Sequence, residues 1–227
     1  MALAFGLFGL HRGVNTEPET LVRRAELAEV AGFEALWVGD HVTLPYGEQA
    51  LPGNPADQPR LEVVVALGAS LADRGARTDE YLAAMRAIWD ESAPSFAGQF
   101  VSFDEVMQRP LPVQRPNPPI VVGGSSPAAY RRAIVSGNGF YASRMNVERA
   151  AEVLGEIRKL SGRHERPAEL GELEITLTPS EEIDLDTARR YADLGVHRLL
   201  LWPHDVGEAG TLERYIETVG STLIGKV

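Results

Sequence analysis

Cysteine is absent from all 227 residues of the chain. Without a thiol, the protein can form no disulfide scaffold and can use no thiolate as a nucleophile. Cysteine-ligated zinc sites and iron–sulfur clusters are excluded for the same reason. Any catalytic or metal site must therefore be built from histidine, carboxylate, hydroxyl or backbone groups.

Long apolar segments are lacking as well. No stretch approaches 18 apolar residues without a charge, so we expect no membrane-spanning helix and no membrane partner. The apolar start, residues 1–10, has no basic region before it and no small-residue cleavage site after it. We therefore expect no signal peptide and a cytoplasmic protein.

Positive charge is scarce. The chain has 22 Lys and Arg against 32 Asp and Glu, for a formal net charge of −10, and the charges are interspersed. No basic patch marks a nucleic-acid surface, so we expect no nucleic-acid partner. Hydrophobic residues make up 44 % and charged residues 24 %, which is typical of a globular protein.

Short apolar runs alternate with segments of helical spacing along most of the chain. This alternation predicts an α/β fold with a parallel sheet, in one domain over residues 1–227. The first helix is expected to begin with Thr16 as its cap, Pro18 in the first turn and Glu19 completing a capping box, and to stop at Gly32. The six expected strands are 3–10, 33–38, 119–122, 140–143, 173–178 and 198–202.

The middle of the chain breaks this rhythm. Residues 61–72 have helical spacing, although three consecutive valines leave a strand possible, and residues 78–89 form a clearer helix with no strand between the two. Residues 96–103 are expected to form a small hairpin. The long Pro- and Gly-rich loop over residues 43–60 has the length of a lid or a binding loop.

Histidines follow three of the expected strands, and acidic residues accompany two of them. His11 ends the first strand, Asp40 and His41 end the second, and His204 and Asp205 end the last. In parallel α/β barrels the working groups lie at these carboxyl ends, where an imidazole can exchange a proton near neutral pH. The alternative interpretation is an ordinary loop histidine at each place.

A metal site is a weaker interpretation of the same residues. The chain has no His-x-His pair on a strand and no His-x-x-x-His on a helix, so the usual ligand spacing is missing, and we predict no metal. His164 and His197 lie away from the strand ends and are expected to be structural or solvated.

A glycine-rich turn joins the third strand to the following helix, and it consists of Gly123, Gly124, Ser125 and Ser126. Two glycines allow an anion to approach free backbone N–H groups closely, and the serines can bind a phosphate or cap the helix. Pro127 suits the first helical turn. The turn is the best local phosphate site in an acidic chain, and a plain glycine turn with a serine cap is the alternative.

Five segments together resemble the luciferase-like monooxygenase superfamily, in particular its coenzyme F420-dependent oxidoreductases of actinobacteria. They occur in the family's order, span most of the chain, and are residues 25–42, 74–89, 96–103, 110–116 and 119–127. The resemblance implies a (β/α)₈ TIM barrel that holds a deazaflavin or flavin at its carboxyl-end mouth.

By this resemblance His41 would act near the reacting carbon as base or acid, and Asp40 would contact the cofactor ring. The Gly123–Ser126 turn would hold the cofactor phosphate, and residues 43–60 would be a lid. The implied chemistry is hydride transfer between a small organic substrate and coenzyme F420. An FMN-dependent monooxygenase is the alternative, because the motifs do not separate the two cofactors.

The chain departs from the family between residues 71 and 75, where its second helix leads directly into the next one. One strand–helix–strand segment, on the order of 50–60 residues, is expected to be missing. A sheet of six strands cannot close with the usual geometry of an eight-stranded barrel, so we expect an open or collapsed barrel. If residues 61–70 form a strand instead, seven strands are present and the gap is narrower. The open edges would need cover, so we expect a homo-oligomer, most simply a dimer.

Two further hypotheses come from other functional classes. The missing segment belongs to the heart of the family's cofactor site, so the chain is alternatively a non-catalytic remnant or a partner subunit. A metal-dependent hydrolase that uses the strand-end histidines is the other. For the substrate, Leu44, Tyr46 and Leu51 favour an apolar or mixed small molecule.

Overall fold

The computed structural model describes residues 2–10, 17–38, 73–90, 94–106, 109–203 and 210–227. Its residues group into two compact units. The first unit comprises Met1–Gly68, Ala142–Glu152 and Ile175–Val227, and the second comprises Ala69–Tyr141 and Val153–Glu174. The single domain expected from the sequence stays a prediction.

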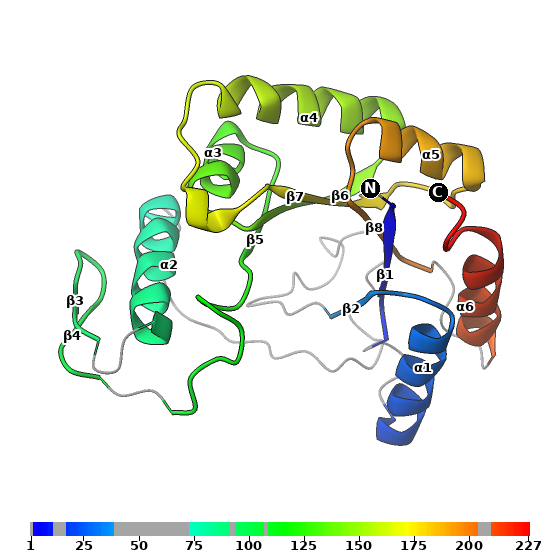
Figure 1. Cartoon of the computed structure of the whole chain (residues 1–227), viewed down its shortest axis with the longest axis horizontal. Helices are drawn as coiled ribbons and strands as arrows, with labels where there is room; N and C mark the ends of the chain where they lie inside the picture. The colour runs from blue at the N-terminus through cyan, green and yellow to red at the C-terminus, as the bar shows by residue number, and fades with distance from the viewer. Residues whose placement is uncertain (1, 11–16, 39–72, 91–93, 107–108, 204–209) are drawn as a thin grey trace, which may run out of the picture. The chain divides into compact units, whose positions relative to one another are not determined.

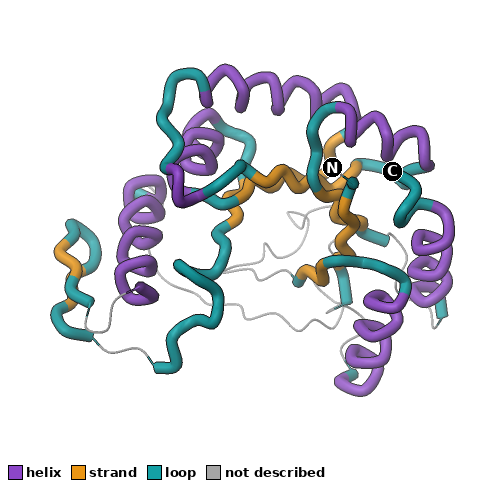
Figure 2. The backbone as a smooth tube through the Cα atoms, in the orientation of Figure 1, coloured by secondary structure: helices purple, strands orange, loops and turns teal. Residues whose placement is uncertain are grey.

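Strands and helices alternate along most of the described chain, as predicted (Figures 1 and 2). The strands are β1 (Ala4–Phe8), β2 (Ala35–Trp37), β3 (Phe96–Ala97), β4 (Ser102–Phe103), β5 (Val121–Gly123), β6 (Gly139–Met145), β7 (Glu174–Pro179) and β8 (Arg198–Leu201). The helices are α1 (Pro18–Val30), α2 (Arg74–Asp90), α3 (Pro127–Ser136), α4 (Val147–Ser161), α5 (Leu185–Asp193) and α6 (Thr211–Thr222), with a 3₁₀ turn at Ala168–Leu170.

Six strands form one sheet in the order β2-β1-β8-β7-β6-β5, and β3 pairs with β4 in a separate antiparallel hairpin. The pairs β1–β2, β1–β8, β7–β8 and β5–β6 are parallel. The α/β class, the parallel sheet and the six strands expected from the sequence are therefore confirmed in the described part of the chain.

The core of the first unit forms because β1 and β8 are apolar on both faces. Four of the five residues of β1 are buried, including Phe5 and Leu7, and Leu199 and Leu200 of β8 lie beside them. A strand covered on both faces needs such a continuous apolar run. Helices α1 and α6 lie next to each other in this unit (Figure 1), and Arg24 of α1 donates two hydrogen bonds to Glu213 of α6.

The core of the second unit is centred on the contact between α3 and the start of β6. Tyr130 packs edge-on against Phe140, with 5.5 Å between ring centroids, and Ile134 is buried in the same unit. Helix α2 is tied to α3 by two ion pairs, in which Arg131 and Arg132 both bind Asp79. These contacts fix α3 and therefore the turn that leads into it.

Two helix starts differ from the sequence expectation. Glu17, and not Thr16, is the N-cap of α1, and it makes no side-chain cap hydrogen bond. Pro18 suits the first helical position, which places the cap immediately before it. Helix α2 begins at Arg74, four residues before the predicted start at residue 78, so Asp79 lies in its second turn. The hairpin at 96–103 is confirmed, whereas residues 43–60 and 61–72 lie outside the described residues.

No helix in the described part of the chain is long and apolar enough to cross a membrane.

Candidate functional site

The turn between β5 and α3 has the geometry of a capped helix start. Ser126 is the N-cap in an extended conformation, and its hydroxyl oxygen accepts a 3.3 Å hydrogen bond from the N–H of Ala129. The carbonyl of Ser126 accepts a 3.0 Å bond from the N–H of Tyr130, and Pro127 occupies the first helical turn. The sequence hypothesis of a serine cap is therefore confirmed for Ser126.

The two glycines of this turn have different roles. Gly124 has φ of +136°, a conformation that side-chain-bearing residues rarely adopt, and an added Cβ would lie 2.8 Å from the Cβ of Ala129. Gly123 leaves more room, since its added Cβ would meet Tyr141 only at 3.8 Å. Gly124 is therefore required for the turn to pack on its own helix. Gly123 is the last residue of β5, and because it has no side chain its backbone stays accessible.

Residues 123–128 are exposed, so an anion can reach the turn from solvent. The first N–H groups of a helix lack partners within the helix and carry partial positive charge, which suits a phosphate oxygen. The exposed Ser125 hydroxyl adds a further donor. The turn therefore fits a phosphate group, although the Ser126 hydroxyl already accepts the cap bond.

The strand-end histidines lie outside the described residues, together with Asp40 and Asp205. This applies to His11, His41 and His204. No group of three potential metal ligands gathers among the residues that the structure does describe. His197 is structural, as expected, because its Nδ1 atom accepts a 3.0 Å hydrogen bond from the N–H of Ile175.

The first unit has a cluster at strand ends that the sequence analysis missed. Phe8 ends β1 and Trp202 directly follows β8, and their half-buried rings are 5.0 Å apart at 57°. The pairing of Leu7 with Leu201 sets this contact, because it brings the next residues of both strands together. The guanidinium of Arg144, near the end of β6, lies 5.9 Å from the Trp202 ring centroid, within the range of a cation–π interaction.

Arg144 has a left-handed backbone with φ of +55°, which is uncommon for a residue with a side chain. The neighbouring Met145 is held firmly, since its carbonyl accepts hydrogen bonds from the Tyr191 hydroxyl at 2.6 Å and from the N–H of Ser180 at 3.0 Å. Burial raises the pKa of Tyr191 to about 12, so this hydroxyl remains a donor at neutral pH. Backbone strain held in place by surrounding bonds is a common feature of functional sites.

A signal for part of this cluster was present in the sequence. Trp202 stands at a strand end beside His204 and Asp205, whereas Phe8 looked like any apolar strand residue. Arg144 carries no sequence sign of its left-handed backbone, and the Tyr191 hydroxyl that binds the neighbouring Met145 comes from 46 residues away in the sequence.

Comparison with known proteins matches residues 52–202 to the luciferase-like monooxygenase family. An FMNH₂-dependent dimethylsulfone monooxygenase of Pseudomonas putida is 30 % identical over 99 residues, which cover 44 % of this chain and 27 % of that protein. An uncharacterized protein of Mycobacterium tuberculosis strain H37Rv is 25 % identical over 210 residues, which cover 89 % of this chain and 68 % of that protein. The matched part thus spans about a quarter of the first relative and two thirds of the second.

Solved structures agree in fold. An F420-dependent secondary alcohol dehydrogenase superposes with a TM-score of 0.70 at 13 % identity, covering 98 % of both chains. The coenzyme F420-dependent tetrahydromethanopterin reductase of Methanopyrus kandleri gives 0.68 at 12 % identity, covering 99 % of both. Long-chain alkane monooxygenase gives 0.66 at 12 % identity, covering 97 % of this chain and 91 % of that one.

Identities this low show a shared fold only, whereas the family match covers more than half of the chain. The chain therefore belongs to the luciferase-like monooxygenase family, whose members are oxidoreductases or monooxygenases.

Proposed function

We propose that the protein is an oxidoreductase that transfers a hydride between a small organic substrate and coenzyme F420. The observation that carries this proposal is the exposed, capped turn Gly123–Ser126, whose geometry suits a phosphate group. The resemblance to the family would assign the cofactor phosphate to this turn. Two proteins of the same fold are F420-dependent according to their names.

Different residues of the chain would bind the cofactor phosphate, contact the cofactor ring and transfer the proton. Backbone N–H groups at the start of α3, with the Ser125 hydroxyl, would bind the cofactor phosphate. Asp40 would contact the cofactor ring, and a ring nitrogen of His41 would take or return the single proton of the reaction. When bound, the deazaflavin supplies the hydride acceptor or donor.

The cluster of Phe8, Trp202 and Arg144 at strand ends of the first unit would help to bind the substrate. The half-buried rings of Phe8 and Trp202 form an apolar surface at strand ends, and Arg144 places a cation beside it. Such a combination would orient a small substrate that has an apolar body and an electron-rich group.

An FMN-dependent monooxygenase is the second candidate. The dimethylsulfone monooxygenase of Pseudomonas putida is FMNH₂-dependent by name and is 30 % identical over the matched part. The Gly123–Ser126 turn fits either cofactor, because each carries a phosphate group that a helix start can bind.

A fluorescence titration of the whole chain with coenzyme F420 and, in parallel, with FMN tests the proposal. We expect saturable binding of F420 and binding of FMN that is weaker by about tenfold or more, a difference of about 1.4 kcal/mol. Tighter binding of FMN would favour the monooxygenase. Binding of neither by a chain that unfolds cooperatively would overturn the proposal and favour a non-catalytic remnant or a partner subunit.

A further inference from the structure

The second unit contains a cavity of about 600 Å³ at the opposite end of β5 from the Gly123–Ser126 turn. Pro119 and Asn138, which line it, lie just before β5 and β6. Because these two strands are parallel, the cavity lies at their amino ends and the turn lies at the carboxyl end of β5. At about 3.3 Å for each strand residue, on the order of 10 Å separates the two places.

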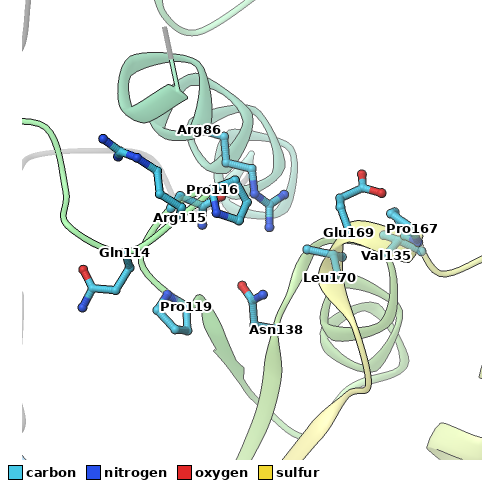
Figure 3. A pocket seen from close by; sticks show the side chains of 11 residues that line it. Arg86, Gln114, Arg115, Pro116, Pro119, Val135, Asn138, Pro167, Glu169 and Leu170 are labelled. Atoms are coloured by element: carbon cyan, nitrogen blue, oxygen red, sulfur yellow. The ribbon is translucent and has the colours of Figure 1, made fainter.

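Two side chains with hydrogen-bond donors point into this cavity. Figure 3 shows the guanidinium of Arg86 and the amide of Asn138 directed into the same space, whereas Arg115 points away from it. Arg86 uses its Nη2 atom to donate to the carbonyl of Ser136, which leaves its other N–H groups for a ligand. A carboxylate can accept charge-assisted hydrogen bonds from a guanidinium and a further hydrogen bond from an amide N–H.

Asn138 is fixed before any ligand arrives. Its side-chain oxygen accepts a 2.9 Å hydrogen bond from the backbone N–H of Ile120. The backbone N–H of Asn138 donates a 2.7 Å hydrogen bond to the carbonyl of Ile120. Its carbonyl also accepts a 3.1 Å bond from the N–H of Glu174. Because the side-chain oxygen is held in this way, the Nδ2 atom is the part of the amide that remains for a ligand in the cavity. Little conformational entropy is lost on binding, since the side chain is already fixed.

The rest of the wall is part apolar and part polar, with Gln114 and Asn117 among its polar residues, and its prolines make it stiff. Pro116, Pro119, Pro167 and Leu170 line the cavity, and proline rings lose little freedom when a ligand packs on them. The charged residues of the lining are Arg86, Glu169 and Arg115, and the guanidinium of Arg115 points away from the cavity. The volume lies within the range of small-molecule sites.

We propose that this cavity is a second binding site, separate from the cofactor turn, for a small molecule that carries one carboxylate on an apolar, ring-sized body. Arg86 and the Nδ2 atom of Asn138 bind the carboxylate, and the prolines contact the apolar body. The site does not depend on which cofactor the protein uses.

Calorimetric titration of the full chain tests the proposal with benzoate as the probe, benzamide as its neutral counterpart and inorganic phosphate as a compact anion. We expect saturable binding of benzoate and weakening of about tenfold or more for benzamide, because the charge-assisted bonds are lost. Binding of phosphate tighter than that of benzoate would overturn the proposed ligand class, and the absence of benzoate binding would overturn the site.

Two variants locate the bound carboxylate. Asn138→Asp keeps an oxygen for the Ile120 N–H but replaces the Nδ2 donor by a negative oxygen, so thermal unfolding should change little while benzoate affinity falls about tenfold or more. Arg86→Gln should lower the affinity for benzoate by a similar factor. Arg163→Gln removes a positive charge from an exposed place that does not line the cavity, and it should leave benzoate affinity unchanged. Full benzoate affinity in a folded Asn138→Asp variant would refute the assignment.

Discussion

At the scale of single residues, Glu80 shows how one side chain holds a separate element. Its carboxylate accepts hydrogen bonds from the backbone N–H groups of Gln99 at 2.8 Å, Phe100 at 2.7 Å and Val101 at 2.8 Å. Burial acts to raise the pKa of Glu80, but these three bonds and the charge of Arg77 outweigh it and lower the pKa. The carboxylate therefore stays ionised and ties the β3–β4 turn to α2.

His41 is the residue whose loss should matter most for the proposed reaction. We expect His41→Ala to abolish turnover and to leave cofactor affinity nearly unchanged, because the imidazole would move a proton and would not hold the phosphate. Steady-state rates and the F420 titration, measured on the same preparation, separate the two effects. His164→Ala removes a half-buried histidine of the second unit and serves as the control. Full turnover in His41→Ala would remove His41 from the mechanism.

Some residues were predictable from the sequence and others were not, for a physical reason. Gly124, Ser126 and Pro127 act within a few residues of each other, so their order in the chain already indicated the turn. Glu80 finds its partners about 20 residues away, and Arg144 meets Trp202 from a different strand. Contacts of that kind depend on tertiary packing, which the local pattern does not contain.

At the scale of elements, the start of α3 serves both stability and the proposed phosphate site, and two substitutions separate these roles. Ser126→Ala removes the acceptor for the Ala129 N–H and should cost about 1 kcal/mol of unfolding free energy. Ser126→Asp keeps a cap oxygen, so stability should be retained, but its negative charge should weaken F420 binding by about tenfold or more. Denaturant unfolding and the fluorescence titration measure the two quantities.

Ser221→Asp is the matched control for the added charge. It places the same side chain at an exposed position of α6 that is not part of the Gly123–Ser126 turn, and F420 affinity should not change. If Ser126→Asp bound F420 as tightly as the original chain, the phosphate would have to lie elsewhere.

Element starts show where local patterns mislead. The sequence pattern predicts a helix start at residue 78, and the glycine at position 75 disfavours a helix by about 1 kcal/mol relative to alanine. The structure begins α2 at Arg74, and Asp79 in its second turn is held by Arg131 and Arg132 of α3. Arg132 also donates a 3.0 Å hydrogen bond to the carbonyl of Gly75, so tertiary contacts from α3 reach the added first turn.

At the scale of the whole molecule, stability in acid should depend on the ion pair between α1 and α6. Arg24 is only 3 % exposed, donates to Glu213 at 2.7 and 3.1 Å, and has an Nη1 atom with no partner among the described residues. The hydrogen bond from Arg24 lowers the pKa of Glu213. A buried guanidinium that loses its carboxylate is costly, so Glu213→Gln should lower the unfolding free energy at pH 7 by about 2 kcal/mol.

The sign of the pH effect follows from this lowered pKa. The contribution of Glu213 is fully present above its ordinary pKa of 4.5 and is lost as the pH falls through the lower value of the folded state. Protonated Glu213 resembles glutamine, so the stability gap between the original chain and Glu213→Gln should close toward pH 3. Urea unfolding at pH 7, 5, 4 and 3 measures this gap, with Glu217→Gln on the exposed side of α6 as the control. A gap that stayed constant down to pH 3 would mean that the lost stability comes from packing around Arg24 and not from the charge of Glu213.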